Sequence, residues 1–185
     1  MNRASRQAAL WATAAAVPVA VLVAILLVIR LSADSPRPTP SPSPRPQATG
    51  PVRMAAPPLT PRAATLCRAL VSQLPGAVRD RAQRPVTAGT EQNAAYGDPP
   101  ITMSCGVPEP SFPPTDLVYP LDAVCWHADE SRSDATVWTT VDRETAVQVT
   151  VPRTYDAPGQ WTIAFANPIV ASVPRLTSVP TGCGG

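Results

Sequence analysis

The only histidine of the chain lies where several chemically active side chains come close together in sequence. His127 is preceded by Cys125 and followed by Asp129 and Glu130. An imidazole beside carboxylates can act as a general base or as a metal ligand. Such a string is a poor metal signature if the cysteine forms a disulfide, and a surface histidine beside a polar turn is the commoner case. We therefore keep His127 and the adjacent Trp126 as possible binding residues and expect no catalytic residue, metal or cofactor.

Motifs of the large enzyme classes are missing from the sequence. It contains no G-x-S-x-G nucleophile elbow, no P-loop and no dinucleotide fingerprint. Any serine or cysteine nucleophile would need His127 as its base. An envelope hydrolase or transferase that uses His127 with the nearby acids remains the alternative to a binding protein. Trp126, Trp138 and Trp161 are expected in the core, because a small domain needs its large apolar residues inside.

A second group of candidate binding residues is the run Tyr96-Gly97-Asp98-Pro99. Asp98 could accept hydrogen bonds from a ligand, while Tyr96 could supply an apolar platform. The favoured interpretation is structural: Gly97 takes a positive φ, Asp98 caps a turn and Pro99 sets the entry to the next strand.

The four cysteines, Cys67, Cys105, Cys125 and Cys183, are widely spaced and contain no C-x-x-C pair. An even number at such spacing predicts two disulfides and an oxidising compartment. Three pairings are possible. We favour Cys67–Cys105 and Cys125–Cys183, because the second would tie down the carboxyl terminus.

A long apolar segment, Ala8–Ile29, precedes all four cysteines. No charge occurs from Gln7 through Ile29, and a helix of this length would span the hydrocarbon core of a bilayer. A cleaved signal peptide is the alternative, but the run is longer than usual and Arg30 follows it. We predict a single-pass signal anchor in the cell membrane, with the lipid bilayer as its partner. The flanking charges are nearly balanced, so the cysteines decide the orientation: residues 1–7 cytoplasmic, the remainder extracytoplasmic.

Residues 30–58 are predicted to be a disordered linker, because prolines alternate with polar residues and favour polyproline II. Charge then separates along the chain. Residues 1–58 carry six Arg and one Asp, whereas residues 59–185 carry nine Arg and twelve acids. The predicted domain at 59–185 is therefore mildly acidic, and we expect no nucleic-acid partner.

The domain itself reads as a mixture of helices and strands. Thr60-Pro61 is a helix start, with a hydroxyl N-cap and proline at the first helical position, and Pro75-Gly76 ends the helix. Residues 77–89 are predicted to be irregular, and 93–100 to be a turn. Alternating or apolar runs predict strands or parts of strands at 101–107, 117–126, 136–142 and 146–151, with a final helix at 158–172. The predicted class is α+β, a small antiparallel sheet flanked by amino- and carboxyl-terminal helices.

The order of these pieces resembles the actinobacterial domain of unknown function 3515 over about Leu66 to Val173. The residues that carry the resemblance are Cys67 on the first helix, Leu74-Pro75, Tyr96-Gly97-Asp98-Pro99, Cys105-Gly106-Val107, Trp126, Thr140 to Arg143 and Val147 to Pro152. The resemblance implies a secreted or membrane-anchored protein and no particular activity.

Together these observations predict a membrane-anchored extracytoplasmic protein. Its domain would bind a cell-envelope component or a protein partner. A structural subunit that docks into a membrane complex through Ala8–Ile29 is a further alternative.

Overall fold

The computed structural model describes residues 21–28, 30 and 47–184. Within these residues no helix is both long enough and apolar enough to cross a bilayer. The predicted tail at 1–7 and most of the predicted anchor at Ala8–Ile29 lie outside the described residues, and residues 21–28 of the anchor are helical. The domain belongs to a separate compact unit, Pro46–Gly185.

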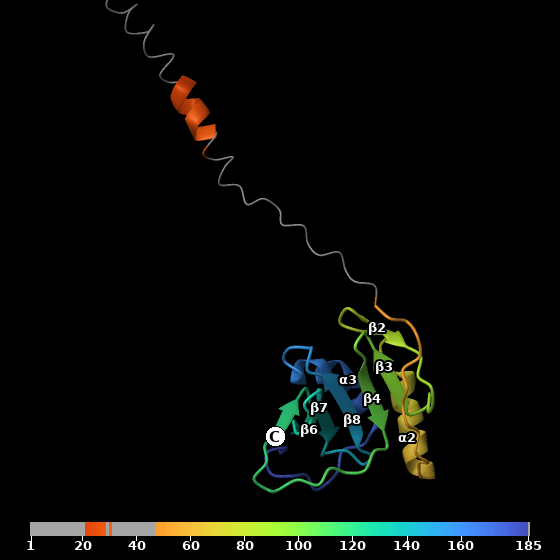
Figure 1. Ribbon diagram of the computed structural model, residues 1–185. Coiled ribbons are helices and arrows are strands. Elements are labelled where there is room, and N and C mark those ends of the chain that lie inside the picture. The colour runs from red at the N-terminus through yellow and green to blue at the C-terminus, as the bar shows by residue number, and fades with distance from the viewer. Residues whose placement is uncertain (1–20, 29, 31–46, 185) are drawn as a thin grey trace, which may run out of the picture. The chain divides into compact units, whose positions relative to one another are not determined.

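The domain is built on one antiparallel sheet of eight strands in the order β1-β2-β3-β4-β8-β7-β6-β5. Two labelled helices, α2 (Pro61–Ser72) and α3 (Gly159–Ser172), complete it (Figure 1). The strands are β1 (Ala77–Val78), β2 (Arg81–Arg84), β3 (Asn93–Tyr96), β4 (Ile101–Cys105), β5 (Val118–Leu121), β6 (Val124–Asp129), β7 (Ala135–Thr140) and β8 (Val147–Pro152). The predicted α+β class is confirmed, with a larger sheet than expected.

Local chemistry sets the start of α2, whereas tertiary packing maintains α3. The Thr60 side chain accepts a hydrogen bond from the Ala63 N–H at the start of α2, as the sequence predicts. Helix α3 contains Pro168 and still runs from 159 to 172. Its core face, which includes Phe165 and Ile169, is fully buried, so tertiary packing outweighs the hydrogen bond that proline removes.

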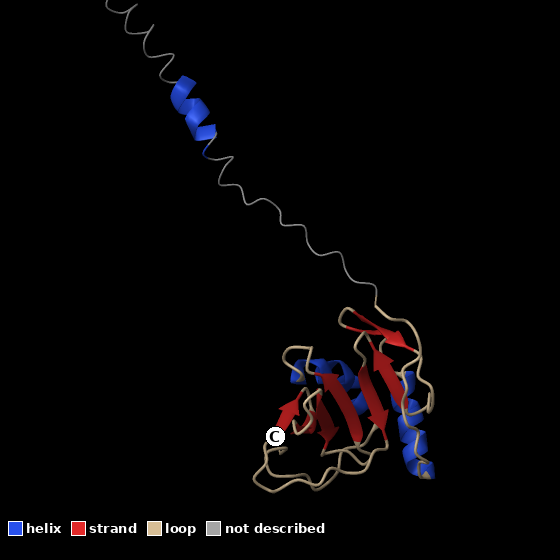
Figure 2. Cartoon of the chain, viewed as in Figure 1, coloured by secondary structure: helices blue, strands red, loops and turns tan. Residues whose placement is uncertain are grey.

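The two helices cover the same face of the sheet, and the core lies between them and the strands (Figure 2). Alternate residues of each central strand point into this core, such as Val147, Val149 and Val151 of β8. The opposite face carries the residues between them and is called the open face below.

Two predicted segments differ from the structure. Residues 77–89, expected to be irregular, contain β1, which has only two residues, and β2, whose sequence Arg-Ala-Gln-Arg shows no apolar alternation. Residues 93–96, expected in a turn, form the fully buried strand β3. The turn itself is confined to 97–100, where Gly97 has a φ of 72° and an added Cβ would lie 2.8 Å from the Arg81 side chain.

The domain also begins earlier than residue 59. Residues 31–46 of the predicted linker lie outside the described residues, but 47–58 pack against the sheet. Val52 forms a parallel bridge with Val86, and the guanidinium of Arg84 donates to the Gly50 carbonyl at 2.7 and 3.0 Å. The sequence gives no sign of this contact. Residues 47–58 have the composition of a linker, and Arg84, which donates to Gly50, lies more than thirty residues away.

The favoured disulfide pairing is confirmed. Cys67 of α2 joins Cys105 of β4, and Cys125 of β6 joins Cys183 of the carboxyl-terminal tail. All four cysteines are buried. One bridge fastens a helix to the sheet and the other fastens the tail.

Candidate functional site

Neighbouring residues of β6 point to opposite faces of the sheet. Trp126 is fully buried in the core under the helices. His127 therefore lies on the open face, paired in register with Val118 of β5 and Thr139 of β7. The structure thus places the indole away from any ligand and leaves His127 near the surface.

The imidazole of His127 is held between two groups of the loop that joins β4 to β5. Its ring stacks on Phe112, with the centroids 4.1 Å apart and an interplanar angle of 9°. Its Nε2 lies 3.3 Å from Oδ2 of Asp116. The His127 side chain is 12% exposed as a result. These contacts attach the loop to the sheet, so His127 acts first as a docking point for the loop.

The two acids that follow His127 in sequence do not join it in a metal site. Asp129 accepts a hydrogen bond from the Ser131 N–H at 2.8 Å, and this bond holds the pKa of the Asp129 carboxyl below its ordinary value. Among the described residues, no group of three His, Cys, Asp or Glu side chains is placed to hold a metal ion.

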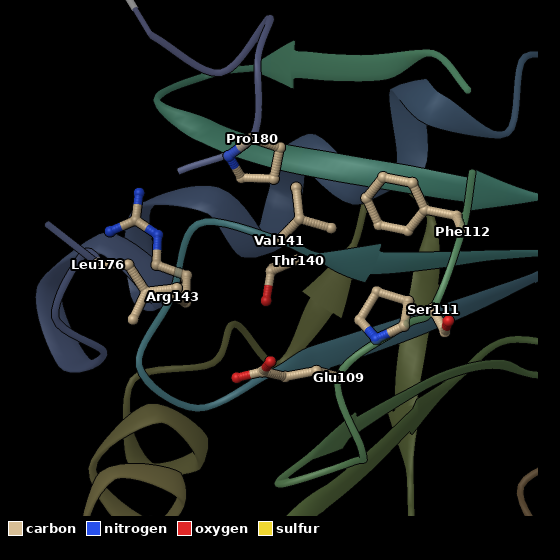
Figure 3. A pocket seen from close by; sticks show the side chains of 9 residues that line it. Glu109, Ser111, Phe112, Thr140, Val141, Arg143, Leu176 and Pro180 are labelled. Carbon is tan, nitrogen blue, oxygen red and sulfur yellow. The ribbon is translucent and has the colours of Figure 1, made fainter. Parts of the chain in front are cut away.

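Beside the stacked pair lies an open hollow of about 340 Å³ (Figure 3). Three segments far apart in sequence form it: the β4–β5 loop, the turn after β7 and the carboxyl-terminal tail. Its lining comprises Glu109, Pro110, Ser111, Phe112, Thr140, Val141, Arg143, Leu176 and Pro180. Apolar rings, a carboxylate and hydroxyls thus surround one space of a size that suits small ligands or an anchoring side chain. We call it the loop–tail hollow.

A buried charged cluster supports one wall of the loop–tail hollow. Asp142 is 1% exposed and lies 3.3 Å from Nε of Arg143 and 3.6 Å from Nε of Arg175. Arg143 also donates to the carbonyls of Val173 and Ala123. The cluster therefore joins the β7–β8 turn to the tail, and it keeps the carboxylate paired in a low-dielectric environment.

The other predicted binding residues, Tyr96 and Asp98, are not brought to this hollow. Tyr96 is fully buried, its hydroxyl donates to the Pro75 carbonyl at 3.0 Å, and burial raises its pKa to about 12. Asp98 is exposed, with Oδ1 4.0 Å from Nη1 of Arg84. The favoured structural interpretation of this run fits both placements, since Tyr96 cannot present its ring to a ligand.

Sequence reasoning missed most of the loop–tail hollow. Phe112, Ser111 and Leu176 lie in proline-rich or irregular segments with no periodic pattern. Thr140 and Arg143 stand out in the sequence only as the ends of the Thr-x-x-Arg string that resembles the family. The available signal was that string together with Cys183, since a bridged tail must return to the sheet.

Fold and site together define a disulfide-bonded α+β domain with helices on one sheet face and a hollow beside the other. Over residues 15–176 the chain matches the family described as protein of unknown function DUF3515, and it belongs to that family. Comparison with curated proteins and with solved structures finds no match.

Proposed function

We propose that this chain is a membrane-anchored extracytoplasmic protein whose domain binds a cell-envelope component or a protein partner. The uncharged segment from Gln7 through Ile29 supports the anchor. The two buried disulfides support an oxidising compartment. Together they support a domain that faces away from the cytoplasm.

The observation that carries the binding role is the construction of the loop–tail hollow. Its three walls are each fixed from behind: the loop by the Phe112–His127 stack, the turn by Arg143, and the tail by the Cys125–Cys183 bridge. A hollow with walls fixed in this way loses little conformational entropy on binding, which favours recognition. Leu176, 36% exposed at its rim, supplies apolar area for a partner.

The test is site-specific photocrosslinking of the full chain in living cells. A photoreactive phenylalanine analogue replaces Ser111, an exposed residue of the hollow, or Arg68, an exposed residue of α2 used as the control. We expect one discrete adduct from position 111 and none from position 68. The adduct should disappear in a Leu176→Asp variant. Equal adducts at both positions, or an adduct insensitive to Leu176→Asp, would contradict binding at this hollow.

A further inference from the structure

A row of polar side chains crosses five neighbouring strands on the open face of the sheet. Register pairs Asn93 with Ser104, Ser104 with Gln148, Gln148 with Thr139, and Thr139 with His127. Polar residues are ordinary on a solvated sheet face. Here, however, Asn93 at one end is 3% exposed and the His127 side chain at the other end is 12% exposed, so other segments of the chain cover both ends of the row.

The amino-terminal segment covers one end. The side-chain amide of Asn93 donates to the Ala55 carbonyl at 2.8 Å, and that of Gln92 donates to the Pro57 carbonyl at 3.2 Å. The backbone of Met54 donates to Thr87 at 3.1 Å. These bonds hold residues 54–57 over β3 and β4. Between this segment and the open face lies a second hollow of about 310 Å³.

This second hollow, which we call the open-face hollow, has a polar floor and a mainly apolar wall. Thr102, Ser104 and Gln148 form the floor and are all half-buried, so water or a ligand reaches them. The Gln148 amide nitrogen donates to Thr139 at 3.4 Å, which leaves the amide oxygen as an acceptor. Met54 and Val107 belong to the wall.

The charge of the lining restricts the ligand class. Among the residues that the structure describes, Arg53 is the only charged one that lines this hollow. A strongly cationic ligand would find no carboxylate here, and a polyphosphate would find a single guanidinium. Neutral hydroxyl and amide groups match the floor, and a small methyl group matches Met54 and Val107. A saccharide that bears acetamido groups combines all three.

We propose that the open-face hollow binds an N-acetylated saccharide through the hydroxyl and acetamido groups of the saccharide. Ser104 and Gln148 exchange hydrogen bonds with the acetamide and the ring hydroxyls, and the acetamide methyl packs on the wall. This inference rests on the proposed function for one point only, the extracytoplasmic location in which the domain would meet such a saccharide. It concerns a different site from the loop–tail hollow.

The test compares two soluble trisaccharides of the same linkage. N,N′,N″-Triacetylchitotriose, called chitotriose below, carries acetamido groups where cellotriose carries hydroxyls. The purified full chain, with disulfides intact and in a detergent without sugar groups, is titrated with each by calorimetry or ligand-observed NMR. We expect chitotriose to bind at least about ten times more tightly, a difference of about 1.4 kcal/mol. Equal affinity for the two, or no binding of chitotriose, would overturn the proposal.

Variants then place the binding in this hollow. Gln148→Ala and Ser104→Ala should each weaken chitotriose binding by about fivefold to tenfold, since each removes a hydrogen-bonding group. Gln160→Ala, on an exposed residue of α3, is the matched control and should bind as the parent does. Thermal unfolding checks that each variant is folded. Chitotriose affinity that is unchanged in both floor variants would contradict the assignment of binding to the open-face hollow. That outcome would not affect the photocrosslinking result at position 111.

Discussion

His127 of β6 and Phe112 of the β4–β5 loop stack face to face, with ring centroids 4.1 Å apart. The loop has no strand or helix of its own between β4 and its final turn before β5. The stack, together with the His127–Asp116 contact, is therefore what holds this proline-rich segment against the open face. The lone histidine of the chain shapes the hollow by fixing its wall.

Replacing Phe112 by alanine should release the loop and leave the sheet intact. Aromatic pairs of this kind contribute about 0.5–1.5 kcal/mol beyond burial, so the loss of global stability should be small. Hydrogen exchange should speed up at Asp116, whose N–H donates to the Pro113 carbonyl, and the adduct from position 111 should weaken. Phe112→Tyr, which keeps the ring, is the control. Unchanged exchange in Phe112→Ala would show that the stack does not hold the loop.

Removing each of the two disulfides should loosen a different part of the domain. Removing the Cys125–Cys183 bridge by a double serine substitution should cost about 2–4 kcal/mol of unfolding free energy, because the unfolded chain gains freedom. Exchange should rise mainly in the tail at 176–183, which lines the loop–tail hollow.

The matched double substitution at Cys67 and Cys105 should loosen the contact between α2 and β4 instead. Hydrogen exchange with mass spectrometry separates the two patterns. Identical exchange maps for the two variants would contradict separate roles for the bridges.

Removing one partner of the buried Asp142–Arg143 ion pair should destabilise the domain more than removing both partners. Arg143→Leu leaves the Asp142 carboxylate in the interior with only Arg175 near it, at 3.6 Å. Breaking a buried pair in this way costs about 3–5 kcal/mol. The double variant Arg143→Leu with Asp142→Leu should recover part of that loss. Denaturant unfolding measures all three proteins, and a double variant less stable than Arg143→Leu would contradict the charge argument.

The alkaline limit of stability should depend on Tyr96. Burial raises the pKa of its hydroxyl from 10.0 to about 12. The unfolded chain loses this proton near its ordinary pKa and the folded chain keeps it longer. The stabilising contribution is therefore complete below the unfolded pKa and is lost as pH rises toward about 12.

Tyr96→Phe should flatten that decline, at the cost of about 1 kcal/mol at neutral pH for the lost bond to Pro75. The pKa of Tyr155 is also raised by burial, and this tyrosine remains in both proteins, so the difference between them isolates Tyr96. Urea unfolding across the alkaline range provides the measurement. Parallel curves for the two proteins would exclude Tyr96 as the source.

Local chemistry made several elements predictable from the sequence. Thr60-Pro61 forecast the start of α2, the alternating valines of β8 forecast a strand with one buried face, and the hairpin of β7 and β8 followed from the same pattern. Each of these elements depends on interactions between residues that are close in sequence, so the local sequence is enough to predict it.

Contacts between residues far apart in sequence explain which elements the sequence did not predict. Residues 47–58 looked like a linker because their partners Arg84 and Asn93 lie more than thirty residues away. Strand β3 looked like a turn because pairing with β2 and β4 defines it, and its own residues show no apolar alternation.

The fold class and the family resemblance follow from the sequence alone. For the four cysteines the sequence favours one of three possible pairings, and the structure confirms that one. The expected core position of Trp126 is confirmed, whereas the folded chain was needed to show that Tyr96 also belongs to the core and that His127 docks a loop. It also decided where the hollows lie, since each is walled by segments distant in the chain. Contacts of this kind join distant segments, and no local sequence pattern encodes them.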